Sequence, residues 1–170
     1  AEQSVHRCGL LHIRLDFVNR RHLRLGFLIL KRRLKVGLEI VVGGEGKAGL
    51  SLALGVEGDK LLCAVTIDTN FDPEYADVNW LFGTKPGAFH RLAIAPDQQG
   101  KGLGKKIIAD VCDILCSQGC DTLRIDTYSN NEKAQRLYAA IGMRKAGEVR
   151  FFHRPLPFYC YELPLNADTP

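Results

Sequence analysis

The chain lacks the long hydrophobic runs and terminal signals that mark a membrane or secreted protein. Phe27-Leu28-Ile29-Leu30 is far too short to cross a bilayer, because a spanning helix needs about 20 apolar residues. No signal peptide is recognisable at the first residues, and no internal repeat or linker is visible. We therefore expect a single domain over residues 1–170 and a cytoplasmic location.

A strong net charge of either sign is also missing. The formal net charge is +4 at pH 7, which suits an anionic ligand but falls short of a typical nucleic-acid-binding protein. Acidic residues are absent between Phe17 and Leu38, where arginine and lysine accumulate. Such a basic stretch is more often a solvated face than a binding surface. The expected partners therefore exclude nucleic acid and membrane.

The six cysteines show no sign of a disulfide framework, because nothing else in the chain resembles a small secreted scaffold. Cys112, Cys116 and Cys120 recur every four residues, which raises the question of a metal site. However, no histidine stands near them, and Gly119 should end the helix before Cys120. We expect all the cysteines to be reduced and no metal to be bound.

A glycine-rich turn between a strand and a helix is the most informative feature. Residues 90–95 read as a strand closed by Pro96-Asp97, and the segment Gln99-Gly100-Lys101-Gly102-Leu103-Gly104-Lys105-Lys106 follows. Apolar residues then recur at helical spacing, namely Leu103, Ile107, Ile108, Val111 and Leu115. At a helix start the first amides lack partners and the dipole is positive, so this turn predicts a phosphate or pyrophosphate site.

The spacing decides which phosphate ligand fits. Only three residues separate Gly100 from Gly104-Lys105, and Lys106 replaces the hydroxyl of a P-loop. A dinucleotide fingerprint fails because Lys105 occupies the position of its last glycine. The pattern that fits is Gln-x-x-Gly-x-Gly, at Gln99, Gly102 and Gly104.

Alternating apolar residues and turn signals predict the remaining elements. A capping box at Ser129-x-x-Glu132 predicts a second helix, which Gly142 should end. A long irregular connection is expected over residues 69–89, and such loops are often functional. In it, Trp80 is equally consistent with packing and with a wall of a binding pocket. Further strands are expected at residues 11–17, 50–54, 61–67, 122–127, 145–152 and 157–163.

Two motifs, in this order, resemble those of the GNAT superfamily of N-acetyltransferases. The Gln-x-x-Gly-x-Gly segment matches its coenzyme A pyrophosphate loop. The second match is Asn131-x-x-Ala134-x-x-Leu137-Tyr138-x-x-x-Gly142-Met143. The resemblance covers roughly residues 50–165. Smaller details resemble a group of small bacterial GNAT proteins without an assigned acceptor, namely Asp72-Pro73-x-Tyr75, Trp80-Leu81, His90-Arg91-Leu92-Ala93 and Arg124-Ile125-Asp126-Thr127.

The resemblance implies an α/β (α+β) fold of the GNAT type. Its mixed, mostly antiparallel sheet would have about six to seven strands flanked by helices, with a splayed pair of parallel strands at the coenzyme site. Within residues 1–48 it implies a first strand and two helices beside the acceptor. Acetyl-CoA would be the acyl donor, and a small-molecule or peptide amine the acceptor. A homodimer is left open.

The same resemblance assigns binding roles to particular residues. Main-chain groups of Leu92 and Ile94 would pair with the pantetheine arm, as an added strand does. Asn131 would hydrogen-bond the coenzyme, with the alternative that it is only a first-turn residue of the helix. The full expected coenzyme-binding set is Leu92, Ile94, Gln99, Gly100, Lys101, Gly102, Leu103, Gly104, Lys105, Asn131 and Tyr138.

The implied reaction is direct acetyl transfer from acetyl-CoA to a primary amine, which must lose a proton before it attacks. His90 and Glu74 are the expected bases, with Asp126 as a further candidate. Tyr138 would face the thioester sulfur and hydrogen-bond its developing charge, although its helical spacing also suits a core residue. Two alternatives remain: a non-catalytic coenzyme A-binding module of the same fold, and a nucleic-acid-binding protein that uses the arginine-rich stretch.

Overall fold

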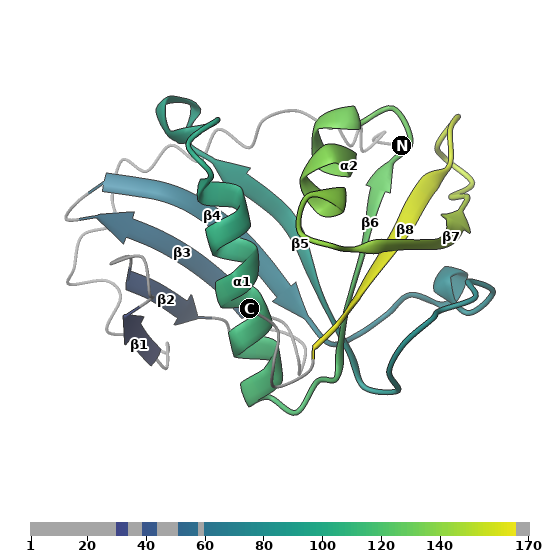
Figure 1. Ribbon diagram of the computed structural model, residues 1–170, viewed down its shortest axis with the longest axis horizontal. Coiled ribbons are helices and arrows are strands. Elements are labelled where there is room, and N and C mark those ends of the chain that lie inside the picture. Colours follow the sequence, from purple (N-terminus) through teal and green to yellow (C-terminus); the bar gives the residue numbers. More distant parts are fainter. Residues whose placement is uncertain (1–29, 34–38, 44–50, 58–59, 166–170) are drawn as a thin grey trace, which may run out of the picture.

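The computed structural model describes residues 30–33, 39–43, 51–57 and 60–165. In this part the chain forms one eight-stranded sheet of order β1-β2-β3-β4-β5-β6-β8-β7, with helices on one face (Figure 1). Every neighbouring pair is antiparallel except β5–β6. The expected fold class is confirmed, with eight strands instead of six to seven. The strands are β1 (Leu30–Arg33), β2 (Glu39–Gly43), β3 (Ser51–Glu57), β4 (Lys60–Asp68), β5 (Pro86–Ile94), β6 (Thr122–Tyr128), β7 (Arg144–Val149) and β8 (Phe158–Pro164).

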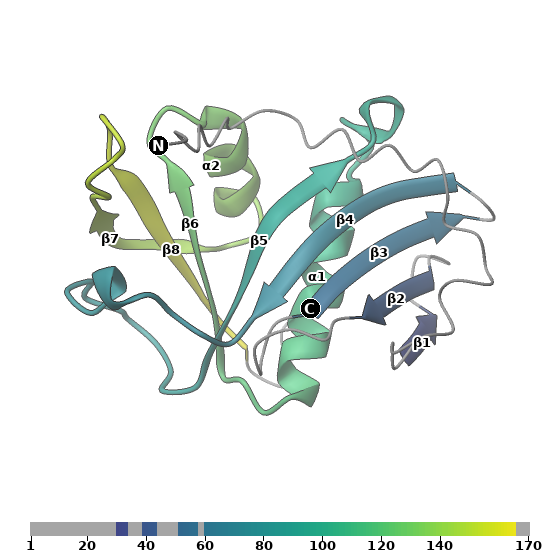
Figure 2. The same ribbon diagram turned by 180° about the vertical axis from the view of Figure 1, so that it is seen from behind.

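Two helices, α1 (Leu103–Ser117) and α2 (Glu132–Ala139), lie on the same face of the sheet, as Figure 1 and the reverse view in Figure 2 show. The apolar stripe expected for α1 is confirmed, because Ile107, Ile108, Val111 and Leu115 are all buried in the main core. Phe89 of β5 and Leu123 of β6 are buried in the same core. The core therefore lies between α1 and the middle of the sheet.

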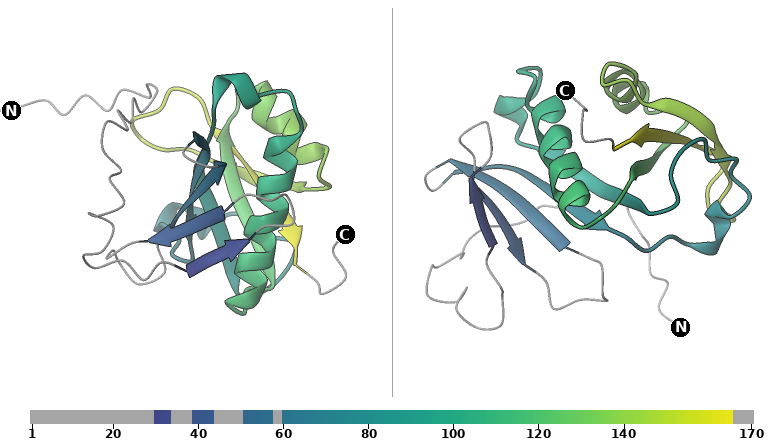
Figure 3. Two further views of the ribbon diagram at one scale, coloured as in Figure 1. Left: turned by 90° about the vertical axis from the view of Figure 1, so that its left-hand side faces the viewer. Right: turned by 60° about the horizontal axis from the view of Figure 1, so that its bottom comes forward.

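The parallel strands β5 and β6 pair over a short stretch and then separate. Pro86, Gly87 and Ala88 pair with Thr122, Leu123 and Arg124, and the two strands diverge beyond that point (Figures 1 and 3). A β-bulge in β5 lies at the divergence. Thr66 of β4 pairs with His90 and Ala64 pairs with Ala93, so β5 carries one extra residue. The expected splayed pair is thus confirmed.

Both helices end at the predicted glycines, but the predicted start of the second helix is wrong. Gly119 (φ 83°) and Gly142 (φ 82°) take the left-handed conformation that ends α1 and α2, as expected. The N-cap of α2 is Asn131, whose side chain accepts a hydrogen bond from the Ala134 N–H at 3.2 Å. Asn131 therefore caps α2 in place of Ser129. The Ser129 N–H donates to the Pro157 carbonyl, and the Ser129 carbonyl accepts from the Gln135 side chain.

Two other expectations need correction. The region 1–48 was expected to hold helices, but residues 30–33 and 39–43 within it form strands that extend the sheet through β3. The irregular connection ends at Lys85, four residues early, because residues 86–89 belong to β5. It contains one short 3₁₀ helix, η2 (Pro73–Tyr75). The predicted strand at 11–17 lies outside the described residues.

The described part of the chain also shows the state of its cysteines, its possible metal-binding clusters and the length of its apolar helices. Cys63, Cys112, Cys116, Cys120 and Cys160 are free thiols. Among the described residues, no three His, Cys, Asp or Glu side chains are grouped so that they could hold a metal ion. Neither helix described here is long and apolar enough to cross a membrane.

Gly87 gives a test of how closely α1 packs on β5. A Cβ at this position would lie 2.3 Å from Leu115 Cδ2. We expect Gly87→Ala to lower the free energy of unfolding by about 1–3 kcal/mol through overpacking. In a Leu115→Ala background the same change should cost less, because the obstructing side chain is gone. Urea unfolding of the four proteins measures this, and equal costs in both backgrounds would contradict the contact.

Candidate active site

The helix start at Gly102 has the form expected of a diphosphate site. The chain leaves β5 through η3 (Pro96–Gln98), and Gly100 (φ 77°) and Gly102 (φ 78°) then take left-handed conformations. Gly102 is the N-cap of α1 and provides no side-chain cap. A Cβ added at either glycine would meet nothing within 4 Å, so the space beside these amides is open. The residues present therefore fit an anionic diphosphate.

Gly104 has a different reason to be glycine. A Cβ there would lie 3.2 Å from Leu137 Cδ2 and 3.4 Å from Ile94 Cδ1. The absence of a side chain thus lets α1 approach both α2 and β5. Gly104 belongs to the expected coenzyme-binding set, but the space beside its Cα is filled by protein. Its amide still belongs to the first turn of α1.

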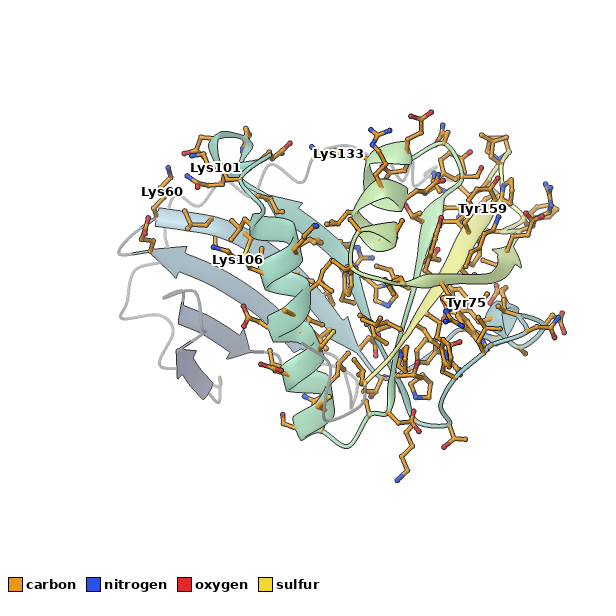
Figure 4. The ribbon with its side chains drawn as sticks, viewed as in Figure 1. Lys60, Tyr75, Lys101, Lys106, Lys133 and Tyr159 are labelled. Carbon is orange, nitrogen blue, oxygen red and sulfur yellow. The ribbon has the colours of Figure 1, made fainter. Side chains whose placement is uncertain are left out.

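Gln99 connects the three elements around the loop. Its side-chain Nε2 donates to the Ile94 carbonyl at 3.0 Å, and its Oε1 accepts from Lys133 Nζ at 2.7 Å. Figure 4 shows Lys101 in the loop and Lys133 on α2. Lys101 and Lys105 are exposed. Gln99 therefore positions the loop against the end of β5 and the start of α2.

The open edge of β5 presents the peptide groups expected to meet pantetheine. The Ala95 N–H donates to Leu62 of β4 at 2.9 Å, so Ala95 faces β4. Because peptide groups of a strand alternate in direction, those of Ile94 and Leu92 face the side of β6. The Ile94 carbonyl already accepts from Gln99. For the pantetheine role, this leaves the Ile94 N–H and the groups of Leu92.

Asn131 and Tyr138 both have structural partners. The Asn131 side-chain oxygen caps α2, as described above, so its expected coenzyme contact would have to use the amide nitrogen. The Tyr138 ring is only 7% exposed, and its centroid lies 6.3 Å from that of Phe89 and 5.5 Å from that of Tyr161. Burial raises the pKa of the Tyr138 phenol, and Asp126 and Tyr161 add to the shift. The hydroxyl is therefore a hydrogen-bond donor at neutral pH.

A cavity of about 150 Å³ lies against the part of the sheet where β5 and β6 part. His90 of β5 and Asp126 of β6 both line it, and so do residues of the connection that carries η2. Burial raises the pKa of Asp126, while the charge of His90 opposes that shift. Burial, and after it the charge of Asp126, raise the pKa of the Tyr75 phenol well above its usual range. The lining residues are Asp68, Asn70, Phe71, Asp72, Tyr75, Trp80, Ala88, His90, Arg124, Ile125 and Asp126.

Of the expected bases, the structure brings His90 and Asp126 together but leaves Glu74 apart. Glu74 is exposed on η2 and does not line the cavity, whereas its neighbour Tyr75 does. Trp80 is both a packing residue and part of the cavity wall. It lines the cavity, and its Nε1 donates to the Tyr75 carbonyl at 3.2 Å.

A buried carboxylate that sequence reasoning missed holds the cavity wall in place. Glu162 of β8 is fully buried and accepts from Arg124 Nε at 2.9 Å and from the N–H groups of Leu81 and Phe82. The Arg124 guanidinium lies over the Trp80 ring, 4.5 Å from its centroid. Period-two alternation of β6 does place Arg124 beside Asp126 on one face. No local sequence pattern predicts the buried role of Glu162, because its partners are distant in the sequence.

Comparisons with known proteins identify the family of the chain. The model of the acetyltransferase (GNAT) family matches residues 47–143, and the chain belongs to this family of acyltransferases. A thialysine N-ε-acetyltransferase from Bos taurus is 33% identical over 62 residues, 36% of each chain. A mycothiol acetyltransferase from Rhodococcus opacus is 31% identical over 108 residues, which are 64% of this chain and 34% of that one. These matches thus span about a third of each relative's length.

A solved structure shows the same fold. An acetyltransferase from Salmonella typhimurium, determined with its cofactor acetyl-CoA, superimposes with a TM-score of 0.53 at 17% identity. The superposition covers 71% of this chain and 68% of that one.

The Glu162 contacts predict a large loss of stability on neutralisation. Glu162→Gln leaves the Arg124 charge without its buried partner, so we expect the free energy of unfolding to fall by about 3–5 kcal/mol. Glu132→Gln is the matched control, because Glu132 pairs with Arg136 across one helical turn with both side chains exposed. That change should cost less than about 0.5 kcal/mol. Similar losses in the two variants, measured by urea unfolding, would contradict the role given to Glu162.

Proposed function

We propose that this protein is an N-acetyltransferase that moves an acetyl group from acetyl-CoA to a primary amine by direct attack in a ternary complex. One observation carries the proposal. The open helix start at Gly102 and the cavity with His90 and Asp126 both adjoin the splayed strands β5 and β6. A donor held by its diphosphate at the helix start can therefore lie along β5 toward the cavity. Family membership supports the same reaction class.

The chain's own groups would bind and orient the donor. The amides between Gln99 and Gly104 would hold the diphosphate, since several hydrogen bonds to a charged group, each worth about 1.5–3 kcal/mol, converge there. The Ile94 N–H and the peptide groups of Leu92 would pair with the pantetheine arm. Acetyl-CoA supplies the activated acyl group, as a thioester whose thiolate is a fair leaving group.

His90 would take the proton that the amine must lose before it attacks. Histidine is the side chain that most often acts as a general base, and Asp126 lies beside His90 in the cavity lining. As the new C–N bond forms and the C–S bond breaks, negative charge develops on sulfur. The Tyr138 hydroxyl would donate a hydrogen bond to that charge. Its raised pKa disfavours full proton transfer to the thiolate.

The first test measures turnover and the part of Tyr138 in it. Release of free thiol from acetyl-CoA should occur with some members of a panel of primary amines. Tyr138→Phe should lower kcat by about 100-fold, the lower end for a general acid, with coenzyme affinity nearly unchanged. Tyr159→Phe, on β8 outside the cavity lining, is the control and should keep full activity. Tight coenzyme binding without turnover on any amine would favour a non-catalytic coenzyme-binding module.

The second test asks whether backbone or lysine side chains hold the diphosphate. Gly102→Val puts a β-branched residue at a φ of 78°, which distorts the helix start without a steric clash. We expect coenzyme A affinity to fall at least about tenfold, because several charge-assisted bonds weaken together. Lys101→Ala removes one exposed charge and should cost only about twofold. Calorimetric titration with coenzyme A compares them, and equal losses would refute the backbone site.

A further inference from the structure

The cavity between β5, β6 and the η2 connection carries an excess of negative charge. Asp68 at the end of β4, Asp72 just before η2 and Asp126 of β6 all line it. Asp72 is exposed and Asp126 is partly buried, so the carboxylates extend from the rim inward. Burial is the main cause that raises the pKa of both Asp126 and Tyr75, and the charge of Asp72 adds to both shifts.

The arginine in the lining does not balance this charge. Arg124 is paired with the buried Glu162, and its Nη2 donates to the Phe82 carbonyl at 3.0 Å. In the described stretch from 60 to 165, no lysine or arginine forms an ion pair with Asp68, Asp72 or Asp126. His90 is the other basic group of the lining. A ligand that brings positive charge would therefore relieve repulsion between the carboxylates.

Aromatic side chains complete the wall next to the carboxylates. The Tyr75 ring centroid lies 6.4 Å from that of Phe71 and 6.5 Å from that of Trp80. Such rings provide apolar contact for methylene groups and favourable faces for an ammonium group. The lining thus combines surfaces for an alkyl chain with carboxylates for a cation.

We propose that the acceptor is an aliphatic diamine or polyamine, an inference that rests on the acetyltransferase function proposed above. One amine, deprotonated beside His90, attacks the acetyl group, and a second ammonium group is held by Asp68 and Asp72 at the rim. The alkyl chain between them lies against Tyr75 and Trp80. An acceptor that carries a carboxylate in place of the second amine is rejected by the same aspartates.

The chain's single tryptophan makes the test independent of turnover. Trp80 lines the cavity, so its fluorescence reports a ligand bound there. Diaminobutane, butylamine and aminobutyrate share a four-carbon chain and differ only in the second group. We expect diaminobutane to bind about tenfold more tightly than butylamine, the effect of two partly exposed ion pairs, and aminobutyrate to bind more weakly than either. Titration calorimetry measures the same three affinities if binding leaves the Trp80 fluorescence unchanged.

Substitutions locate the effect at the rim. In Asp68→Asn/Asp72→Asn the side-chain oxygen that accepts from Asn70 is kept, so the loop geometry is preserved. Diaminobutane should then bind only as tightly as butylamine, while butylamine affinity stays the same. Asp77→Asn is the control, because Asp77 is an exposed carboxylate on the same connection that does not line the cavity. It should keep the full preference.

The outcomes separate the two proposals. Equal binding of diaminobutane and butylamine by the unmodified protein, or a preference that survives in the double variant, overturns the diamine proposal. Acetylation of butylamine as efficiently as diaminobutane overturns it as well and leaves the acetyltransferase function intact. A preference for diaminobutane in binding, with no acetyl transfer to any amine, refutes the acetyltransferase function and shows that the cavity selects diamines for another purpose.

Discussion

The separation of β5 from β6 is the constraint on which the rest of the site depends. Two parallel strands that stayed paired would use their facing peptide groups on each other. Here the extra residue of β5 near Arg91 (φ 53°) bends that strand, and pairing stops after Ala88. The peptide groups beyond this point face an opening instead of a partner strand. The same bend carries the end of β5 to the glycine turn that starts α1, so one irregularity places both the edge and the loop.

The opening also joins two different surfaces of the sheet. Tyr138 approaches from the helix-covered face and is packed between Phe89 and Tyr161, whereas His90 and Asp126 line the cavity. Burial is the main cause of the raised pKa of the Tyr138 phenol, and the charge of Asp126 nevertheless adds to it. The two groups are thus close enough to interact electrostatically, although they belong to different environments. On the proposed function, the hydroxyl that donates to the leaving thiolate and the base that accepts the amine proton would therefore lie on opposite sides of one gap.

Local signals were sufficient for most of the fold, and among the residues that line the cavity the sequence had already singled out His90, Asp126 and Trp80. Apolar spacing predicted α1, glycines predicted the helix ends, and alternation predicted most of the strands, because each depends on neighbours in sequence. Glu162 could not be found this way, since it meets Arg124 across 38 positions of the chain. The position of Glu74 could not be predicted from local signals either. Glu74 is exposed, whereas Tyr75, the next residue of the same 3₁₀ helix, lines the cavity. Gly104 is explained only once α2 is packed against α1.

The modest net charge of +4 conceals a division of charge that matters for two substrates. Exposed lysines, among them Lys101 and Lys105, surround the helix start, whereas Asp68, Asp72 and Asp126 line the cavity. On the proposed function, an anionic donor and a cationic acceptor would thus each meet charge of the opposite sign. Each would also be disfavoured in the site of the other. Since both sites open at the same gap between β5 and β6, this arrangement would keep the two ligands in the order that direct transfer requires.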